Sequence, residues 1–188
     1  LDHAATTVLR PVAREAFLEA SAAWGNPSSV HAAGRRARAV LDEALERIAG
    51  LLGVPRSWLI MTSGGTEADN TAIFGAAASR FGEGHVITTS VEHPAVLQAC
   101  SQLPSVTIIP VDGHGLVDPD DVRKAIQKDT RLISVMHVNN ELGVIQPVAE
   151  IAKIAHEAGV LFHSDGVQAL GKMAVNASDI GADLYSIS

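Results

Sequence analysis

The chain has 188 residues and a formal net charge of −7, so it lacks the basic surface of proteins that contact nucleic acid. Hydrophobic residues make up 47% and charged residues 19% of the sequence, which excludes intrinsic disorder and allows a buried core. No apolar run reaches the roughly 18 residues of a membrane span, so no membrane contact is expected. A single cysteine, Cys100, cannot form an internal disulfide, which favours a reducing compartment, the cytoplasm or an organellar matrix.

The hydrophobic pattern predicts two helices first, over residues 11–22 and 34–52. The second has an apolar stripe at helical spacing and is ended by Gly53 and Pro55. Short apolar runs then alternate with helical segments. The expected strands are 58–61, 85–89, 106–111, 131–136, 160–162 and 184–187, and the expected helices are 66–79, 94–103, 118–126 and 148–158. Apolar strands separated by amphipathic helices indicate a mostly parallel sheet covered on both faces, a three-layer, doubly wound α/β fold.

Both ends of the sequence are informative. Leu1 is not an initiator methionine, and the last residues, 184–188, still follow an apolar strand pattern without a turn or a polar tail. Because a domain rarely ends on an interior strand, we expect the chain to be part of a longer protein.

Ligands of open α/β sheets bind beyond the carboxyl ends of the strands, so the loops that follow the strands are the first candidates for a site. The first such loop, residues 62–70, has two glycines and several hydroxyls and leads directly into a helix. Free backbone N–H groups and the helix dipole make this an anion site, most naturally for a phosphate. The alternative is an ordinary turn in which Thr66 is the N-cap. The loop matches neither the P-loop nor the dinucleotide-binding pattern.

Three further loops carry polar side chains: residues 90–94, 137–143 and 163–168. Asp165 has no Lys or Arg beside it in the sequence, so its partner is either a cationic ligand group or the backbone of the segment that it caps. His93 precedes a helix that begins with proline, and it is either a general base or a capping residue. The histidines form no zinc-binding array, so no metal is expected. Cys100 lies inside a helical pattern, which predicts an inert, packed thiol.

The motifs at these loops resemble those of cysteine desulfurases, in the class V aminotransferase-like branch of the fold type I enzymes that use pyridoxal 5′-phosphate (PLP). The resemblance covers essentially the whole chain. It rests on residues 1–7, 25–31, 62–67, 92–93, 137–143 and 165–168. One departure is the Gly166–Val167 pair, which replaces the more usual Ala–Thr.

The resemblance implies roles for several residues. Gly65, Thr66 and Ser188 would bind the PLP phosphate. Asp165 would pair with the pyridinium nitrogen and keep it protonated. The remaining implied ligands are Gln168, which would hydrogen-bond the phenolic oxygen; Asn140, beside that oxygen and the substrate carboxylate; and His93, which would stack on the ring and transfer protons.

The resemblance also implies an organisation: an N-terminal segment over 1–10 and a partial PLP-binding large domain over 11–188. Residues after Ser188 would supply the Schiff-base lysine, the nucleophilic cysteine and a small C-terminal domain. The implied activity converts L-cysteine to L-alanine and a protein-bound persulfide, in a homodimer that delivers sulfur to an iron–sulfur scaffold or a tRNA-thiolation protein. A selenocysteine lyase and a non-catalytic scaffold remain as alternatives. An aminotransferase is disfavoured, because transaminases of this fold usually have an aromatic ring where His93 stands.

Overall fold

The computed structural model describes residues 2–79 and 82–188. Contacts within the chain divide it into two compact units, one that ends at Ile60 and one from Met61 to Ser188. The division after residue 10 that the sequence suggested is a different boundary, and it stays a prediction.

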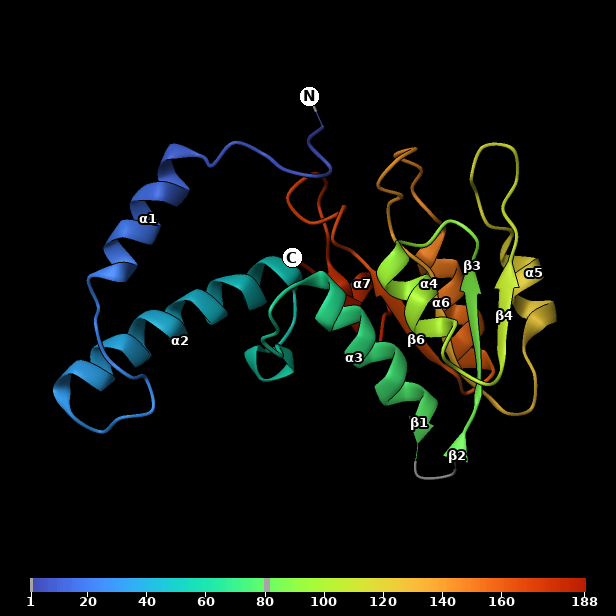
Figure 1. Cartoon of the computed structure of the whole chain (residues 1–188), viewed down its shortest axis with the longest axis horizontal. Coiled ribbons are helices and arrows are strands. Elements are labelled where there is room, and N and C mark those ends of the chain that lie inside the picture. Colours follow the sequence, from blue (N-terminus) through green and yellow to red (C-terminus); the bar gives the residue numbers. More distant parts are fainter. Residues whose placement is uncertain (1, 80–81) are drawn as a thin grey trace. The chain divides into compact units, whose positions relative to one another are not determined.

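The first unit contains two long helices, α1 (Pro11–Ser21) and α2 (Ala32–Leu52), as the sequence predicts (Figure 1). Proline at the first position of α1 fits the helix start because the N–H that it lacks would have no intrahelical acceptor. The His31 side chain caps α2 by accepting a hydrogen bond from the backbone of Gly34. Gly53 ends α2 in the left-handed conformation, with φ 69°, which favours glycine.

The strand expected over residues 58–61 is wrong. A short 3-10 helix, η1 (Arg56–Trp58), occupies its start, and residues 59–62 have no regular structure. The side chains of Trp58, Ile60 and Met61 are 68%, 78% and 66% exposed. An apolar run becomes a buried strand only where a neighbouring strand supplies hydrogen bonds, and no strand within the described part of the chain pairs with this one.

The second unit is built on a five-stranded parallel sheet in the order β4-β3-β5-β6-β7. Helices alternate with its strands, so the prediction of a doubly wound α/β fold is confirmed (Figure 1). The helix predicted over 66–79 ends two residues early and runs into a small antiparallel hairpin. The elements are α3 (Gly65–Ala77), β1 (Ala78–Ser79), β2 (Gly82–Glu83), β3 (His85–Thr89), α4 (Pro94–Cys100), β4 (Val106–Ile109), α5 (Pro119–Ala125), β5 (Thr130–Ser134), α6 (Val148–Glu157), β6 (Leu161–Asp165), α7 (Ala177–Ile180) and β7 (Leu184–Ser186).

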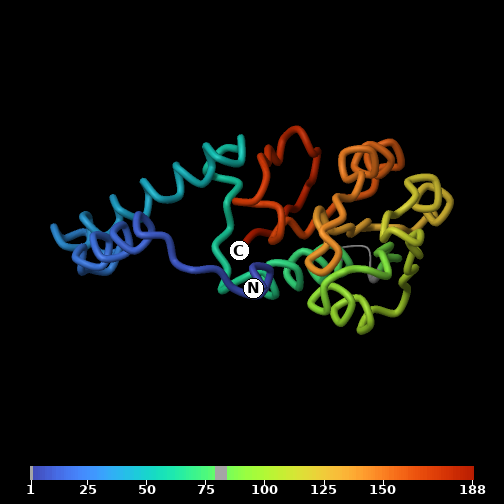
Figure 2. The backbone as a smooth tube through the Cα atoms, turned by 90° about the horizontal axis from the view of Figure 1, so that it is seen from above, coloured from blue at the N-terminus to red at the C-terminus, as the bar shows by residue number. Residues whose placement is uncertain are grey.

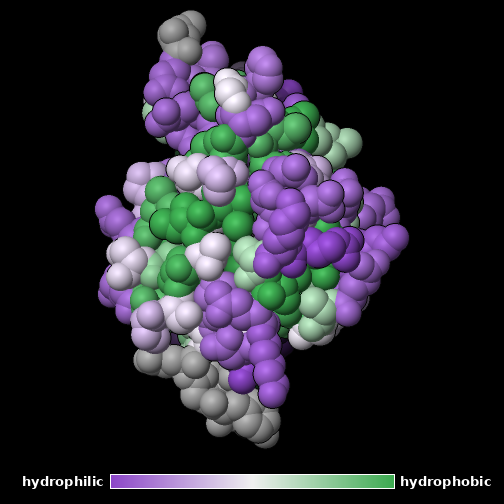
Figure 3. All heavy atoms as spheres, turned by 90° about the vertical axis from the view of Figure 1, so that its right-hand side faces the viewer, coloured by the Kyte–Doolittle hydropathy of each residue, from purple (hydrophilic) through white to green (hydrophobic). Residues whose placement is uncertain are grey.

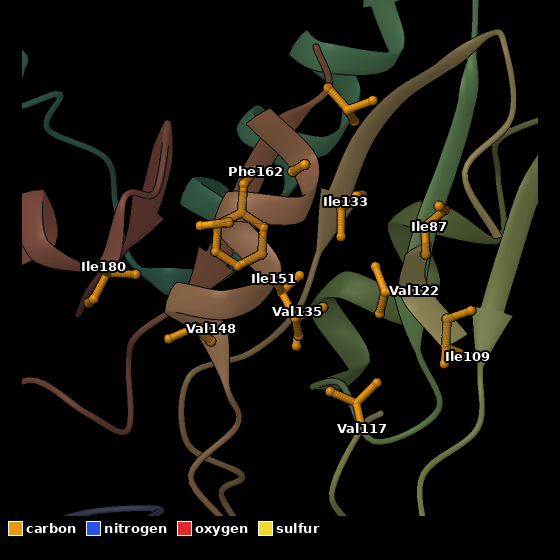
Figure 4. Close-up of a cluster of buried hydrophobic side chains, with 13 residues drawn as sticks. Ile87, Ile109, Val117, Val122, Ile133, Val135, Val148, Ile151, Phe162 and Ile180 are labelled. Atoms are coloured by element: carbon orange, nitrogen blue, oxygen red, sulfur yellow. The ribbon is translucent and has the colours of Figure 1, made fainter. Parts of the chain in front are cut away.

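Hydrophobic residues cover both faces of this sheet. On one face, side chains of the strands pack against α5 and α6 around the fully buried Phe162 (Figure 4). On the other, Val86 and Leu132 pack against α3 and α4. Figure 2 shows α5 and α6 on one side of the strands and α4 on the other. This arrangement explains why the strands lack an alternating polar pattern.

The strand β4 forms one edge of the sheet and is only partly covered. Ile108, in this strand, is 55% exposed. On the side of the molecule where β4 and α5 lie, hydrophobic surface is visible between polar side chains (Figure 3). Within the described residues, no helix is long and apolar enough to cross a membrane.

Candidate cofactor site

Because all five strands are parallel, their carboxyl ends share one edge of the sheet, and the loops that follow them lie together there. Polar side chains are buried at and beyond this edge although the strands themselves are largely apolar. They are Thr88, Thr89, Glu92, Ser134, His137, Asn139, His163, Ser164, Asp165 and Ser186, together with Asp69 of α3. This concentration of buried polar groups marks the edge as the candidate site.

The glycine loop of residues 62–65 leads into α3, as predicted. The Glu67 side chain folds back to accept a hydrogen bond from the Ser63 backbone at 2.6 Å, which orders the loop. Gly64 is the N-cap and Thr66 lies inside the first turn, so the interpretation of Thr66 as N-cap is wrong. The reason is that the helix begins at Gly65, two residues before the start that Thr66 as N-cap would give. The first backbone N–H groups of a helix have no intrahelical acceptor, which suits them to an anion.

Gly65 lies where three segments converge. A Cβ atom added at this position would be 2.9 Å from Cγ2 of Val167 and 3.8 Å from Cβ of Ser188. The start of α3, the loop after β6 and the residue beyond β7 therefore come together, which brings the predicted phosphate ligands Gly65 and Ser188 to one place. Their role in phosphate binding stays a prediction.

Asp165 ends β6 and is 6% exposed. Its Oδ1 accepts a hydrogen bond from the Val167 backbone at 2.9 Å, so the capping interpretation describes a contact that exists. Burial and the charge of Asp69 nevertheless raise the pKa of Asp165. No Lys or Arg within the described residues forms an ion pair with it. The pairing of this carboxylate with a cationic ring nitrogen stays a prediction.

His93 caps α4. Its Nδ1 accepts a hydrogen bond from the Ala95 backbone at 3.1 Å, while the side chain is exposed. The proximity of His93 lowers the pKa of Asp165, but the opposite effect of burial is larger. Capping uses one ring nitrogen, and the other nitrogen and the ring faces are left for a ligand.

The loop of residues 137–143 is held by Asn139. The Asn139 side chain donates to the carbonyl of Val91 at 2.9 Å and accepts from the backbone of Glu141 and Leu142. These bonds fix the loop that presents the half-buried Asn140, the residue that the sequence singled out.

Gln168 follows Asp165 by three residues and is also half-buried. Its Oε1 accepts a hydrogen bond from Lys172 Nζ. Asn140 and Gln168 thus stand on separate loops at the same sheet edge as Asp165, and their contacts with a cofactor stay predictions.

The Glu92 side chain links the end of β3 to the segment that follows β5. Its Oε1 accepts hydrogen bonds from Thr89 Oγ1 at 2.7 Å and from the Met136 backbone at 2.9 Å. Its Oε2 is buried and has no hydrogen-bond partner within the described residues. Burial raises the pKa of Glu92 to about 8, and the charges of Asp165 and Asp69 act in the same direction. At neutral pH the carboxyl therefore keeps its proton.

This carboxyl predicts a pH dependence of stability. A carboxyl whose pKa is raised by folding binds more protons in the folded state, so stability falls as pH rises from its ordinary pKa of 4.5 to about 8. We expect Glu92→Gln to flatten this fall in the free energy of unfolding, measured by urea denaturation of the intact protein across that range. Glu150→Gln, at an exposed position of α6, is the control. Equal slopes for Glu92→Gln and the parent protein would show that Glu92 is ionised when buried.

Comparisons with known proteins identify the family. The family model "Aminotransferase class-V" matches residues 1–188. The chain belongs to the class-V aminotransferase family. It is 49% identical to cysteine desulfurase IscS of Dictyoglomus turgidum and 43% identical to IscS of Methanosarcina thermophila, over all of this chain but 49% and 48% of those proteins. The chain thus spans about half the length of the curated relatives it matches.

Solved structures agree with this assignment. The structure described as SspA in complex with cysteine superposes with a TM-score of 0.95 at 36% identity, over all of this chain and 56% of that one. A NifS-like protein from Rickettsia africae superposes with a TM-score of 0.89 at 33% identity, over 53% of its chain. The expected fold and family are therefore confirmed.

The departure from the family pattern at Gly166 has a structural cause. A Cβ atom at this position would overlap the ring of Tyr185. That ring is held by a hydrogen bond of 2.8 Å between its hydroxyl and Nδ1 of His137. Burial lowers the pKa of His137 and raises that of Tyr185, so the phenol donates to a neutral imidazole. The family's usual alanine is excluded here because Tyr185 fills the space.

We expect Gly166→Ala to lower the free energy of unfolding by about 1–3 kcal/mol, the usual cost of overpacking. The double variant Gly166→Ala/Tyr185→Leu should recover most of this loss, since the shorter side chain leaves room for the methyl group. Gly75→Ala is the control. A Cβ atom at this position meets nothing within 4 Å, and the substitution replaces a glycine inside a helix by a better helix former. If urea unfolding gives Gly166→Ala the stability of the parent protein, the account of this departure is wrong.

The sequence did not reveal a role for four residues of this region: the buried Asp69, Glu92 and His163 and the half-buried Tyr185. One signal was available for Asp69. It precedes the buried residues of α3 at helical spacing, so a carboxylate stands on the apolar stripe of that helix. The other three side chains become informative only when the strands are aligned.

A separate open hollow of about 540 Å³ lies at the start of α6 and is lined by His137, Gln146, Val148, Met173, Asn176, Ile180 and neighbouring residues. None of the predicted site residues lines it. Among the described residues, no group of three or more His, Cys, Asp or Glu side chains is arranged to hold a metal ion.

Proposed function

We propose that the intact protein containing this chain is a PLP-dependent cysteine desulfurase. The reaction cleaves the C–S bond of L-cysteine, releases L-alanine and transfers the sulfur to a cysteine thiol of the enzyme as a persulfide. The named relatives support this activity. The observation that carries the proposal is Asp165, a buried carboxyl at a strand end with no Lys or Arg paired to it among the described residues.

The residues present fit PLP, which has an anionic phosphate at one end and a protonatable ring nitrogen at the other. Val167 and Ser188 approach Gly65 closely, so the start of α3 has space for the backbone of residue 65 but not for a side chain. A phosphate there would accept hydrogen bonds from the first N–H groups of the helix and from the hydroxyls of Thr66 and Ser188. Asp165 would bind the ring nitrogen.

When bound, PLP supplies an electron-accepting pyridinium ring that makes removal of the amino acid α-proton feasible. Asp165 holds the proton on the ring nitrogen. Gln168 and Asn140 orient the ring through its phenolic oxygen. His93 covers the ring and moves protons at its free nitrogen, Nε2, because Nδ1 caps α4.

The partners follow from this proposal. L-cysteine is the substrate, and the persulfide sulfur passes to an iron–sulfur scaffold or to a tRNA-thiolation protein. The enzyme acts as a homodimer in the cytoplasm or an organellar matrix. The Schiff-base lysine and the nucleophilic cysteine are expected after Ser188, as the resemblance implies.

Turnover of the intact protein with two substrates tests the proposal. A cysteine desulfurase releases alanine from L-cysteine together with one sulfur per alanine in the presence of a thiol reductant. A selenocysteine lyase releases alanine from L-selenocysteine and little from L-cysteine, and a scaffold releases none from either. Either of the last two results would overturn the proposal.

The proposal assigns no chemistry to Cys100. Its thiol is buried in α4, and burial raises its pKa to about 11, so it holds almost no thiolate at neutral pH. We expect Cys100→Ala to keep desulfurase activity within about twofold of the parent protein, because the change removes only a packed sulfur atom. Alanine release by the two proteins at equal concentration is the measurement. A loss of more than tenfold with an unchanged melting temperature would identify Cys100 as a sulfur carrier.

A further inference from the structure

A second acid–base pair lies behind Asp165. His163 precedes Asp165 by two residues on β6, so both side chains lie on the same face of the sheet. The Nε2 atom of His163 is 3.5 Å from Oδ1 of Asp69, and the two side chains are 0% and 2% exposed. Nδ1 of His163 is 2.8 Å from Ser134 Oγ, and Nε2 is 3.0 Å from Ser186 Oγ. Hydroxyls can accept from a doubly protonated imidazole, so this environment suits a charged ring.

Asp69 needs a positive charge beside it. Its Oδ1 is buried and makes no hydrogen bond within the described residues. Burying an ionised carboxylate without a partner is strongly unfavourable. No Lys or Arg of the described chain forms an ion pair with Asp69, and His163 is the group in reach that can carry a positive charge.

The other charges of the cluster can be counted in the same way. The titratable groups that face one another here are the carboxyls of Asp69, Glu92 and Asp165, the imidazoles of His93 and His163, the Cys100 thiol and the Tyr185 phenol. Glu92, Cys100 and Tyr185 stay protonated and neutral at pH 7. If Asp69 is compensated by His163, one negative charge remains, on Asp165.

We infer that His163 is a positioning residue whose positive charge neutralises Asp69 and thereby keeps Asp165 ionised for a pyridinium nitrogen. This inference rests on the proposed function, because it requires a cationic ring at Asp165. Without His163, two carboxylates would repel each other in a desolvated space, and Asp165 would take up a proton. A protonated Asp165 no longer holds a proton on the ring nitrogen.

Binding of pyridoxine 5′-phosphate to the apo form of the intact protein tests the inference. This analogue lacks the aldehyde, so its binding does not depend on a lysine. We expect His163→Gln to weaken binding about tenfold and to lower by about one unit the pH at which the bound ring nitrogen loses its proton, followed by ultraviolet absorption. Asp69→Asn/His163→Gln should restore both values, because it removes both charges of the pair. Failure of the double variant to recover either value would overturn the inference.

His156→Gln is the matched control, since it removes a histidine paired with a carboxylate, Asp183 at 3.0 Å, on the exposed surface. It should bind the analogue like the parent protein. A direct measurement keeps the test independent of the folding of His163→Gln. In protein labelled with ¹⁵N at histidine, NMR should show both ring nitrogens of His163 protonated at pH 7, and one of them deprotonated in Asp69→Asn. A neutral His163 ring in the parent protein would overturn the inference.

The proposed function and the role of His163 can be tested separately. If the parent protein does not bind pyridoxine 5′-phosphate, or binds it equally well after Asp165→Asn, the proposed function is wrong. If binding depends on Asp165 but His163→Gln leaves the affinity and the ring-nitrogen titration unchanged, only the role of His163 is wrong.

Discussion

Asp165→Ala is expected to reduce the rate of alanine release from L-cysteine by about 10²–10³-fold, because it removes a preorganised charge from a desolvated site. The fold should survive. Burial raises the pKa of Asp165, so its charge costs stability at neutral pH, and the bond lost with the side chain is the one from the Val167 backbone. Steady-state turnover and thermal unfolding of the same preparations measure the two effects.

Asp120→Ala is the matched control, because it removes an exposed carboxylate from α5. It should leave both turnover and melting temperature near those of the parent protein. If Asp165→Ala released alanine at the parent rate, or lost activity only in proportion to lost folded protein, Asp165 would be a capping residue and nothing more.

His93→Gln is expected to slow alanine release by about 10²–10⁴-fold while the cofactor stays bound, since a side chain that transfers protons typically contributes this much. The effect is separable from capping. His93→Asn keeps a side-chain acceptor that suits an N-cap but also removes the imidazole, so it should preserve the stability of α4 and still lose activity.

Turnover, cofactor content and melting temperature of the two His93 variants distinguish the interpretations. Loss of activity in both, with the melting temperature preserved in His93→Asn, supports proton transfer. Parent-level activity in His93→Asn would mean that His93 acts only through the hydrogen bond from Ala95 to its ring.

The alternation of strands and helices in the second unit could be predicted because the central strands β3, β5 and β6 are largely buried on both faces, while the helices between them have an apolar stripe. The same rule failed at residues 58–61, where the apolar side chains of Trp58, Ile60 and Met61 are exposed. The composition of an apolar run does not show whether another strand is available to pair with it. The prediction of Thr66 as N-cap failed because two glycines allow the helix to begin two residues earlier than a cap at Thr66 would give.

The loops of the site could be predicted because the carboxyl ends of parallel strands always meet at one edge. The contact between the buried side chains of Asp69 and His163 could not be predicted. Asp69 and His163 are 94 positions apart in the printed sequence, and their proximity depends on how α3 packs on β6. The need for glycine at position 166 could not be predicted either, because it depends on the ring of Tyr185 on the neighbouring strand.

A crystal structure of the intact protein with PLP would show directly where the cofactor binds. We expect the phosphate at the start of α3, within hydrogen-bond distance of the Gly65 and Thr66 backbone, and the ring nitrogen within hydrogen-bond distance of an Asp165 carboxylate oxygen. His93 should lie against the ring face. A cofactor in the hollow beside His137, or a ring whose nitrogen faces away from Asp165, would contradict the account.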